Sequence, residues 1–318
     1  MKHVFIVNPV SGKADARKYL VPKLEQAAEQ AGVDYAVETT QYKGHAVDIA
    51  QTLAEREDGQ VRLYACGGDG TLNEVFEGVY RSGRHAEVAS IPCGSGNDYV
   101  RTFGLPQDFL DFGSSIRGTA IPVDLIDTGR GICAALCSVG IDAEVAYNIP
   151  KYRRVPLCGG QMAYNLSIVE RLMRPMGRRL RIEIDDEVFE GEYLICAVCN
   201  GKTYGGGYMA GPGADVQDGL LDVVFVKKIS RLRIAGVLNL YKNGRHMKDG
   251  QVVEQFRDIM TYRRAKRVHI QPTDGGKVIA NIDGECGPAP SLSAAVLPGA
   301  ARFVIPQHLF NGSTYKTV

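Results

Sequence analysis

The chain contains no tryptophan, has almost no net charge and lacks long apolar segments. Its 318 residues hold 37 Lys and Arg against 36 Asp and Glu, and no apolar run approaches the length that spans a bilayer. The apolar run at residues 4–7 is too short for a signal peptide, so we expect a cytoplasmic protein. None of the recognised nucleic-acid-binding modules is present, and no nucleic-acid partner is expected.

Eight cysteines in a chain without a signal peptide indicate reduced thiols rather than a disulfide framework. Cys196 and Cys199 have the spacing of a zinc-binding pair, but they lie in an apolar, strand-like run at residues 193–199. No second pair accompanies them, so the run is interpreted as a core strand.

The most informative stretch is the glycine-rich turn at residues 66–74. It follows a strand-like run at 61–65 and precedes a helical pattern at 75–80. A helix that begins at such a turn presents free backbone N–H groups, which bind phosphate. Asp69 adds a carboxylate that can meet a hydrated metal ion or an acceptor hydroxyl, and Thr71 can cap the helix. Taken alone, the turn can also be no more than a tight connection.

The first part of the chain alternates strands with helices. Strands are expected at 2–7, 35–40, 61–65 and 88–91, with helices over 14–31 and 45–56 and a further helix after the loop at 92–98. This order predicts a doubly wound α/β domain with a parallel sheet over residues 1–123. The loops at 8–13, 39–44, 67–74 and 92–98 all leave carboxyl ends of strands, where such sheets bind ligands. They therefore predict a nucleotide site.

From residue 124 the pattern changes to short strands broken by Gly and Pro. We expect a mostly antiparallel β-sandwich domain over 124–305, and a C-terminal tail, 306–318, that returns to the first domain. The expected helices are 164–173 and 232–241. The expected strands are 124–128, 132–139, 180–185, 188–199, 220–226, 267–271, 278–282 and 302–305.

Charge is unevenly distributed along the chain. Residues 1–125 carry 12 basic and 17 acidic residues (12 − 17 = −5), and the remainder carries 25 and 19 (25 − 19 = +6). The segment 227–270 holds 12 basic and 3 acidic residues, and helical apolar spacing accompanies arginines at 229–241. Contact with an anionic membrane surface and an ordinary solvated face both remain open.

Six motifs together resemble the diacylglycerol kinase catalytic-domain family, whose fold is NAD kinase-like. They are an opening Asn-Pro-x-Ser-Gly-Lys at 8–13, Thr40 with Gly44, the turn at 67–74, a Pro-x-Gly-Ser-Gly-Asn-Asp loop at 92–98, and the segments 214–223 and 282–285. Ser95 stands where the family usually has threonine, which keeps the hydroxyl.

The resemblance implies ATP-dependent phosphorylation of a lipid hydroxyl, with Mg²⁺ as cofactor and diacylglycerol as the first choice of acceptor. Asp69 would organise the catalytic magnesium and Glu285 would accept the hydroxyl proton. A structural magnesium would bind Asp218 and the backbone oxygens of Asp215 and Leu220. The residues expected at the nucleotide are Asn8, Ser11, Gly12, Lys13, Thr40, Gly67, Gly68, Gly70, Thr71, Asn73, Glu74, Ser95 and Asn97.

The family's bracing network would include Asp98, Arg101 and Asp124, with Ser167 at the nearest position to a lysine that some members place there. The resemblance also allows peripheral membrane association and a homodimer. Another lipid alcohol such as a sphingoid base, a soluble acceptor such as NAD, and a nucleotide-binding regulatory protein without turnover remain alternatives. The Asn-Pro-x-Ser-Gly opening and the Asp-Gly-Glu segment favour the lipid kinase over an NAD kinase.

Overall fold

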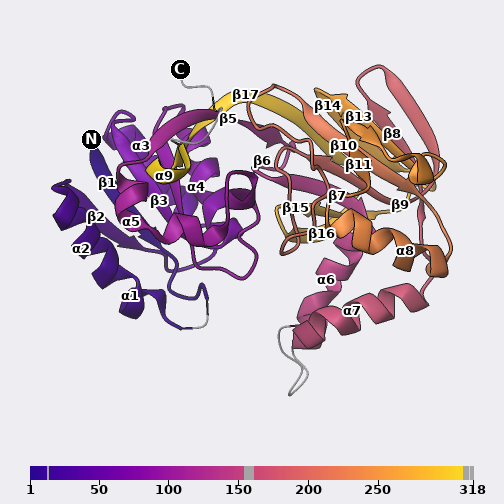
Figure 1. Ribbon diagram of the computed structural model, residues 1–318, viewed down its shortest axis with the longest axis horizontal. Coiled ribbons are helices and arrows are strands. Elements are labelled where there is room, and N and C mark those ends of the chain that lie inside the picture. Colours follow the sequence, from indigo (N-terminus) through magenta and orange to yellow (C-terminus); the bar gives the residue numbers. More distant parts are fainter. Residues whose placement is uncertain (13, 154–160, 311–314, 316–318) are drawn as a thin grey trace. The chain divides into compact units, whose positions relative to one another are not determined.

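The computed structural model describes residues 1–12, 14–153, 161–310 and 315 (Figure 1). The chain divides into two compact units. The first comprises Met1–Leu125, Val216–Gly219 and Leu297–Val318, and the second comprises Ile126–Asp215 and Leu220–Val296. Residues 216–219 and 297–305, which the sequence analysis grouped with the second domain, thus belong to the first unit.

The first unit is built on a parallel sheet. Strand β1 pairs with β2 on one side and β3 on the other, β3 pairs with β4, and β4 pairs in parallel with the end of β17. The elements of this unit are β1 (Lys2–Val7), α1 (Ala16–Tyr19), α2 (Val21–Ala31), β2 (Tyr35–Thr39), α3 (His45–Arg56), β3 (Val61–Gly67), α4 (Asp69–Ser82), β4 (Glu87–Pro92), the 3₁₀ helices η1 (Tyr99–Thr102) and η2 (Pro106–Leu110), α5 (Phe112–Ile116) and α9 (Gln307–Phe310), with parts of β5 (Thr119–Asp127) and β17 (Leu292–Ile305).

Both faces of this sheet are covered. Phe5 and Tyr64 pack against Leu24 of α2 in one core cluster, while the alternate residues Val4 and Leu63 are fully buried as well. Since successive strand residues face opposite sides, the sheet is buried on both faces, as a doubly wound domain requires. The predicted α/β arrangement is therefore confirmed.

The second unit is built on antiparallel pairing. Strands β16, β15, β7, β9, β8 and β14 lie in this order, and β10 pairs with β9 and β13. The elements are β6 (Ile132–Cys133), β7 (Leu136–Gly140), α6 (Ile141–Arg153), α7 (Gln161–Met173), β8 (Arg178–Ile184), β9 (Glu187–Cys199), β10 (Leu221–Lys227), α8 (Arg231–Lys242), β11 (Met247–Lys248), β12 (Gln251–Val252), η3 (Glu254–Phe256), β13 (Met260–Ala265), β14 (Arg267–Pro272), β15 (Val278–Ile282) and β16 (Glu285–Ala289). Cys196 and Cys199 lie buried in β9, and burial raises the pKa of both thiols, as a core strand demands.

Three local expectations were wrong. The helix over 14–31 is interrupted: α1 ends at Tyr19 and α2 begins at Val21, with Pro22 in its first turn, where a missing N–H does no harm. The loop at 92–98 leads only into η1, a single 3₁₀ turn. Helix α6 was not expected, because Pro150 and the β-branched Ile149 before it interrupt the helical pattern.

Candidate active site

Asp124 of β5 binds two segments, 216–219 and 297–305, that come late in the chain but belong to the first unit. One carboxylate oxygen accepts the backbone N–H of Gly219 at 2.7 Å and the other accepts that of Gly299, also at 2.7 Å. The backbone N–H of Asp124 donates to the carbonyl of Val216. This buried carboxylate therefore holds together parts of the unit that lie far apart in sequence.

Three glycine-rich loops of the first unit lie backbone against backbone. A Cβ on Gly94 would lie 2.5 Å from the Cα of Gly68, and a Cβ on Gly12 would lie 2.8 Å from the carbonyl oxygen of Cys93. Only glycine allows these approaches, and Gly12 also has a φ of +89°. The loops that follow β1, β3 and β4 are thus packed together. That these three loops and the loop at 39–44 form one ligand site stays a prediction.

The first turn of α4 is tied to the first loop by side chains. The Nδ2 of Asn8 donates to the Oγ1 of the buried Thr71 at 3.0 Å. A Cβ on Gly67 would lie 2.3 Å from that same Oγ1, so glycine is needed for Thr71 to take this position. Asn8 and Thr71 therefore fix the turn that the phosphate-binding prediction rests on.

Asp69 begins α4 and faces the loop after β4. Its Oδ1 accepts the backbone N–H groups of Asp98, at 2.6 Å, and Tyr99, at 3.1 Å. Burial raises the pKa of the carboxyl group, while the backbone N–H donors counteract the rise by stabilising the anion. Gly96 lies close to the other oxygen, because a Cβ there would stand 2.8 Å from Oδ2. A carboxylate is therefore held in place at the N-terminus of a helix.

Other predicted nucleotide residues surround this turn. Among the described residues, the Oδ1 of Asn73 is buried without a hydrogen-bond partner, as expected of a group that a ligand would satisfy. Asn97 braces its own loop through two hydrogen bonds to Gly94. Thr40 is buried, Ser95 and Gly70 are exposed, and Ser11 donates its backbone N–H to Asn8. Lys13 lies outside the described residues.

Glu74 has a role that the sequence did not reveal. Its Oε1 accepts the backbone N–H of Gly44 at 2.9 Å, and its Oε2 accepts that of Ala46 at 3.3 Å. Gly44 is the N-cap of α3, so Glu74, which lies in α4, caps α3. The negative charge of Glu74 also interacts favourably with the positive N-terminal end of the α3 dipole. No sequence signal links positions thirty residues apart in this way.

In the second unit, Asp283 fixes the turn that carries Glu285. Its carboxylate accepts the backbone N–H groups of Ala134 at 2.5 Å, Ala135 at 2.9 Å and Leu136 at 3.0 Å. Burial raises its pKa, and these three donors act in the opposite direction. Glu285 follows two residues later as an exposed side chain at the start of β16. Asp283 was part of a predicted motif, but its own role was missed.

A second buried carboxylate, Asp142 of α6, is connected to the same turn. Ser138 Oγ donates to it at 2.6 Å, Asn281 Nδ2 donates to Ser138 Oγ at 3.2 Å, and Gly284 donates its N–H to Asn281 Oδ1 at 2.8 Å. Burial raises the pKa of Asp142. The chain of contacts ends one residue before Glu285, so Asp142 supports the position of that glutamate.

The residues predicted for the bracing network and for the structural magnesium differ in burial and contacts. Arg101 lies beside Asp98, with 3.7 Å between Nε and Oδ1. Ser167 is fully buried and donates to the carbonyl of Val145 on α6, so its position is occupied by a helix-packing contact. Asp215 is exposed and Asp218 half-buried. Among the described residues, no three His, Cys, Asp or Glu side chains are grouped to hold a metal ion.

Two family models match most of the chain. Residues 2–128 match the model of the diacylglycerol kinase catalytic domain, and residues 135–305 match that of the YegS C-terminal NAD kinase beta sandwich-like domain. A protein named diacylglycerol kinase from Bacillus subtilis (strain 168) is 30% identical over 284 residues, 89% of each chain. This chain belongs to the diacylglycerol kinase catalytic domain family.

A further sequence relative and a solved structure also resemble this chain. A protein named "Probable lipid kinase YegS-like" from Pseudomonas aeruginosa is 30% identical over 280 residues, 88% of this chain and 87% of the relative. The crystal structure of a diacylglycerol kinase from Bacillus anthracis has a TM-score of 0.67 at 21% identity, and the match covers 97% of this chain and 98% of that one. The predicted fold class, with its β-sandwich second domain, is thereby confirmed.

Proposed function

We propose that this chain is a lipid kinase that transfers the γ-phosphate of ATP to the hydroxyl group of diacylglycerol and gives phosphatidic acid. The observation that carries the proposal is the interlocked set of glycine loops that holds Asp69 at the N-terminus of α4 in the first unit. A helix N-terminus without bulky side chains accepts phosphate, and a carboxylate beside it suits magnesium.

The residues at this turn fit a nucleotide and its metal ion. Asn73 offers a buried, unsatisfied amide oxygen, and Gly70 leaves open space beside the turn, since a Cβ there would meet nothing within 4 Å. In this proposal the backbone of 67–71 binds phosphate oxygens and Asp69 orients the metal ion. Bound Mg²⁺ supplies positive charge to the phosphate oxygens during transfer.

Glu285 is the proposed proton acceptor for the lipid hydroxyl. It is exposed, and its backbone is fixed by Asp283 and by the contacts that run from Asp142 to Gly284. A fixed backbone with an exposed carboxylate suits general-base chemistry, which needs a stable position and access to the substrate. The structural magnesium on Asp218, Asp215 and Leu220, peripheral membrane association and a homodimer stay predictions.

Diacylglycerol is proposed as acceptor because the Bacillus subtilis relative carries that name. The Pseudomonas relative is named only as a lipid kinase, so another lipid alcohol remains the second candidate. Among the described residues no helix is long and apolar enough to cross a membrane.

The test is a labelling experiment that identifies the acceptor. The purified protein is incubated with γ-labelled ATP, magnesium and a total lipid extract in mixed micelles, and the organic phase is separated. We expect one labelled lipid that co-migrates with phosphatidic acid. A different labelled lipid would replace diacylglycerol as the acceptor, and label transferred only to soluble compounds would overturn the lipid kinase.

A further inference from the structure

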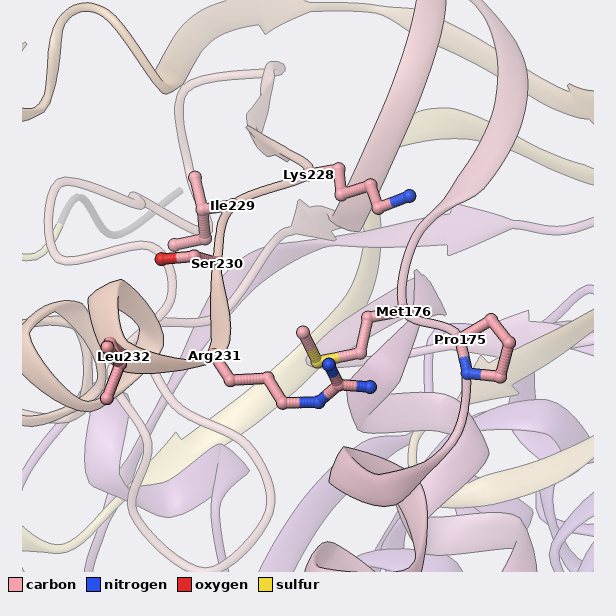
Figure 2. Close-up of a pocket in the computed structure, with 7 residues that line it drawn as sticks. All are labelled: Pro175, Met176, Lys228, Ile229, Ser230, Arg231 and Leu232. Carbon is pink, nitrogen blue, oxygen red and sulfur yellow. The ribbon is translucent and has the colours of Figure 1, made fainter.

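A hollow of about 320 Å³ lies in the second unit at the start of α8, and its polar side chains are Lys228, Ser230 and Arg231 (Figure 2). Lys228 pairs with Glu192 of β9 at 2.9 Å. Arg231 donates to two backbone carbonyls at and just after the end of α7, and the Oγ of Ser230 accepts an N–H group of its own helix. The protein itself satisfies all three polar groups, so we infer no ligand there.

In the first unit, the segment that meets Asp69 is η1, a single turn of 3₁₀ helix. The N–H groups of Asp98 and Tyr99, which Asp69 accepts, lie at its start. Arg101 and Phe103 donate the backbone hydrogen bonds that close the turn. A turn this short is not stable by itself, because it forms few hydrogen bonds for the residues that it fixes. Packing against the rest of the unit must therefore hold these two N–H groups in place.

The ring of Tyr99 joins η1 to α4. It is buried and lies edge-on to Phe76 of α4, with 5.5 Å between the ring centroids, and to Phe303 of β17, with 5.2 Å. Edge-to-face pairs at such distances are attractive and orient both rings. Asp69 is the first residue of α4. The contacts of Tyr99 therefore link the helix that carries the carboxylate to the turn that donates to it.

Phe103 lies at the other end of η1 and is covered by the C-terminal segment. It stacks on Phe303, with centroids 5.0 Å apart, and the centroid of the Tyr315 ring lies 5.6 Å from its own. Phe103 is 9% exposed, whereas Tyr315 is half-buried. Tyr315 thus lies at the edge of an aromatic cluster formed by Phe76, Tyr99, Phe103 and Phe303.

Helix α9 contacts the residues that follow η1. A Cβ on Gly104, which comes directly after Phe103, would lie 2.9 Å from Leu309 Cδ1. The backbone N–H of His308 donates to the Oγ of Ser114 in α5 at 3.1 Å, and the ring Nδ1 of His308 lies 2.7 Å from the same hydroxyl. One apolar contact and one polar contact therefore hold α9 beside the end of η1.

We propose that the C-terminal segment is a positioning element of the phosphate site, with Leu309 and Tyr315 as its contact residues. By packing on the end of η1, it keeps the N–H groups of Asp98 and Tyr99 directed at the carboxylate of Asp69. Both contact residues act through η1 rather than on the reactants. A displacement of about 1 Å in a group that orients reactants can lower turnover about 10²-fold. The expected loss of turnover rests on the proposed function, whereas the packing does not.

The first test is hydrogen–deuterium exchange of the full chain, measured by mass spectrometry in Tyr315→Ala and Leu309→Ala. Amide exchange in residues 97–104 should become about tenfold faster, the effect on a local opening of losing one aromatic or aliphatic contact. Exchange in β2, at the edge of the sheet, should keep the wild-type rate. Tyr315→Phe keeps the ring that packs on Phe103 and should exchange as the wild type does.

The second test separates positioning from general stability. In Tyr315→Ala and Leu309→Ala, kcat for lipid phosphorylation should fall about tenfold while KM for the lipid stays unchanged, because η1 serves the phosphate site and not the lipid. Tyr80→Ala removes an exposed tyrosine near the end of α4 and should change neither kcat nor exchange. Val37→Ala removes packing from β2, so it should lower the unfolding midpoint but leave kcat and exchange in 97–104 unchanged.

Three results would overturn the proposal. They are wild-type exchange of residues 97–104 in both Tyr315→Ala and Leu309→Ala, faster exchange there without a fall in kcat, and equal effects in Val37→Ala, which would make the contacts purely structural. An active lipid kinase with unchanged exchange in both variants refutes the positioning role alone. A wild type that phosphorylates no lipid refutes the proposed function alone. Affinity for Mg²⁺ and ATP, measured by calorimetry, then replaces kcat, and it should fall in Tyr315→Ala but not in Tyr80→Ala.

Discussion

Asp69 Oδ1 accepts the backbone N–H of Asp98 at 2.6 Å, and so joins the loop after β3 to the loop after β4. The same oxygen accepts the N–H of Tyr99. One carboxylate therefore has two tasks, since it holds two loops together and supplies negative charge at the proposed phosphate site. A substitution at this position must separate these tasks to be informative.

Asp69→Asn makes that separation. The asparagine carbonyl oxygen can still accept both backbone N–H groups, but the negative charge is lost. We expect the fold and the thermal unfolding midpoint to be nearly preserved and lipid phosphorylation to fall by at least about 10²-fold, as for the loss of a group that stabilises transition-state charge. The exposed Asp34→Asn is the control. Wild-type turnover in Asp69→Asn would remove this carboxylate from the mechanism.

Gly67 and Gly70 provide a paired test of the phosphate site. In Gly67→Ala the new methyl group would overlap Thr71 Oγ1, so we expect a loss of about 1–3 kcal/mol of unfolding free energy, the usual cost of overpacking. In Gly70→Ala the methyl group enters open space, and the free energy of unfolding should not fall. It would stand beside the proposed phosphates, however, and ATP binding measured by calorimetry should weaken. Full ATP affinity in Gly70→Ala would place the phosphates elsewhere.

The sequence predicted the elements that carry their own local signals. The glycine turn at 67–70 and the loop at 92–98 could be recognised because close backbone approach requires glycine at fixed positions. The strands of the parallel sheet could be recognised because burial on both faces demands continuous apolar runs.

What the sequence did not reveal depends on contacts between distant residues. Asp124 binds Gly219 and Gly299, and no local pattern shows that these segments return to the first unit. Glu74 is predicted at the nucleotide because it sits in the signature turn, but no local pattern shows that it also accepts N–H groups at the start of α3. Helix α6 was missed because Pro150 obscures its pattern, and Asp142 was missed with it.

Glu285 and Asp283 should differ in what their substitutions change. Glu285→Gln alters an exposed side chain, so stability and ATP binding should be kept while turnover falls about 10²–10⁴-fold, the usual effect of losing a general base. Asp283→Asn removes the charge that three backbone N–H groups stabilise, and we expect a loss of about 1–3 kcal/mol of unfolding free energy. Turnover and urea unfolding are measured for both.

The control for this pair is Glu190→Gln, an exposed glutamate on β9 that pairs with Arg181. It should change neither turnover nor stability by a measurable amount. If Glu285→Gln turned over at the wild-type rate, another group would have to accept the proton. If Asp283→Asn were as stable as the wild type, the fixed turn would not depend on this carboxylate.

Two buried histidines should make stability fall in mild acid. Burial lowers the pKa of His246 to about 4, and burial together with the nearby Arg62 lowers that of His3 to about 4. The folded protein therefore keeps both rings neutral, while the unfolded chain takes up protons once the pH falls below about 6.5. Their contribution is fully present above that pH and is lost as the pH falls toward 4.

The change should be about 2 kcal/mol of unfolding free energy for each histidine between pH 8 and pH 5. Because the chain has no tryptophan, urea unfolding is followed by circular dichroism. His246→Gln can keep a donor to the carbonyl of Ala210, which His246 Nε2 meets at 3.2 Å, but it cannot be protonated. Its stability should therefore depend less steeply on pH than that of the wild type, whereas the exposed His85→Gln should keep the wild-type slope. Equal slopes in all three proteins would show that His246 takes up its proton as readily in the folded state as in the unfolded chain.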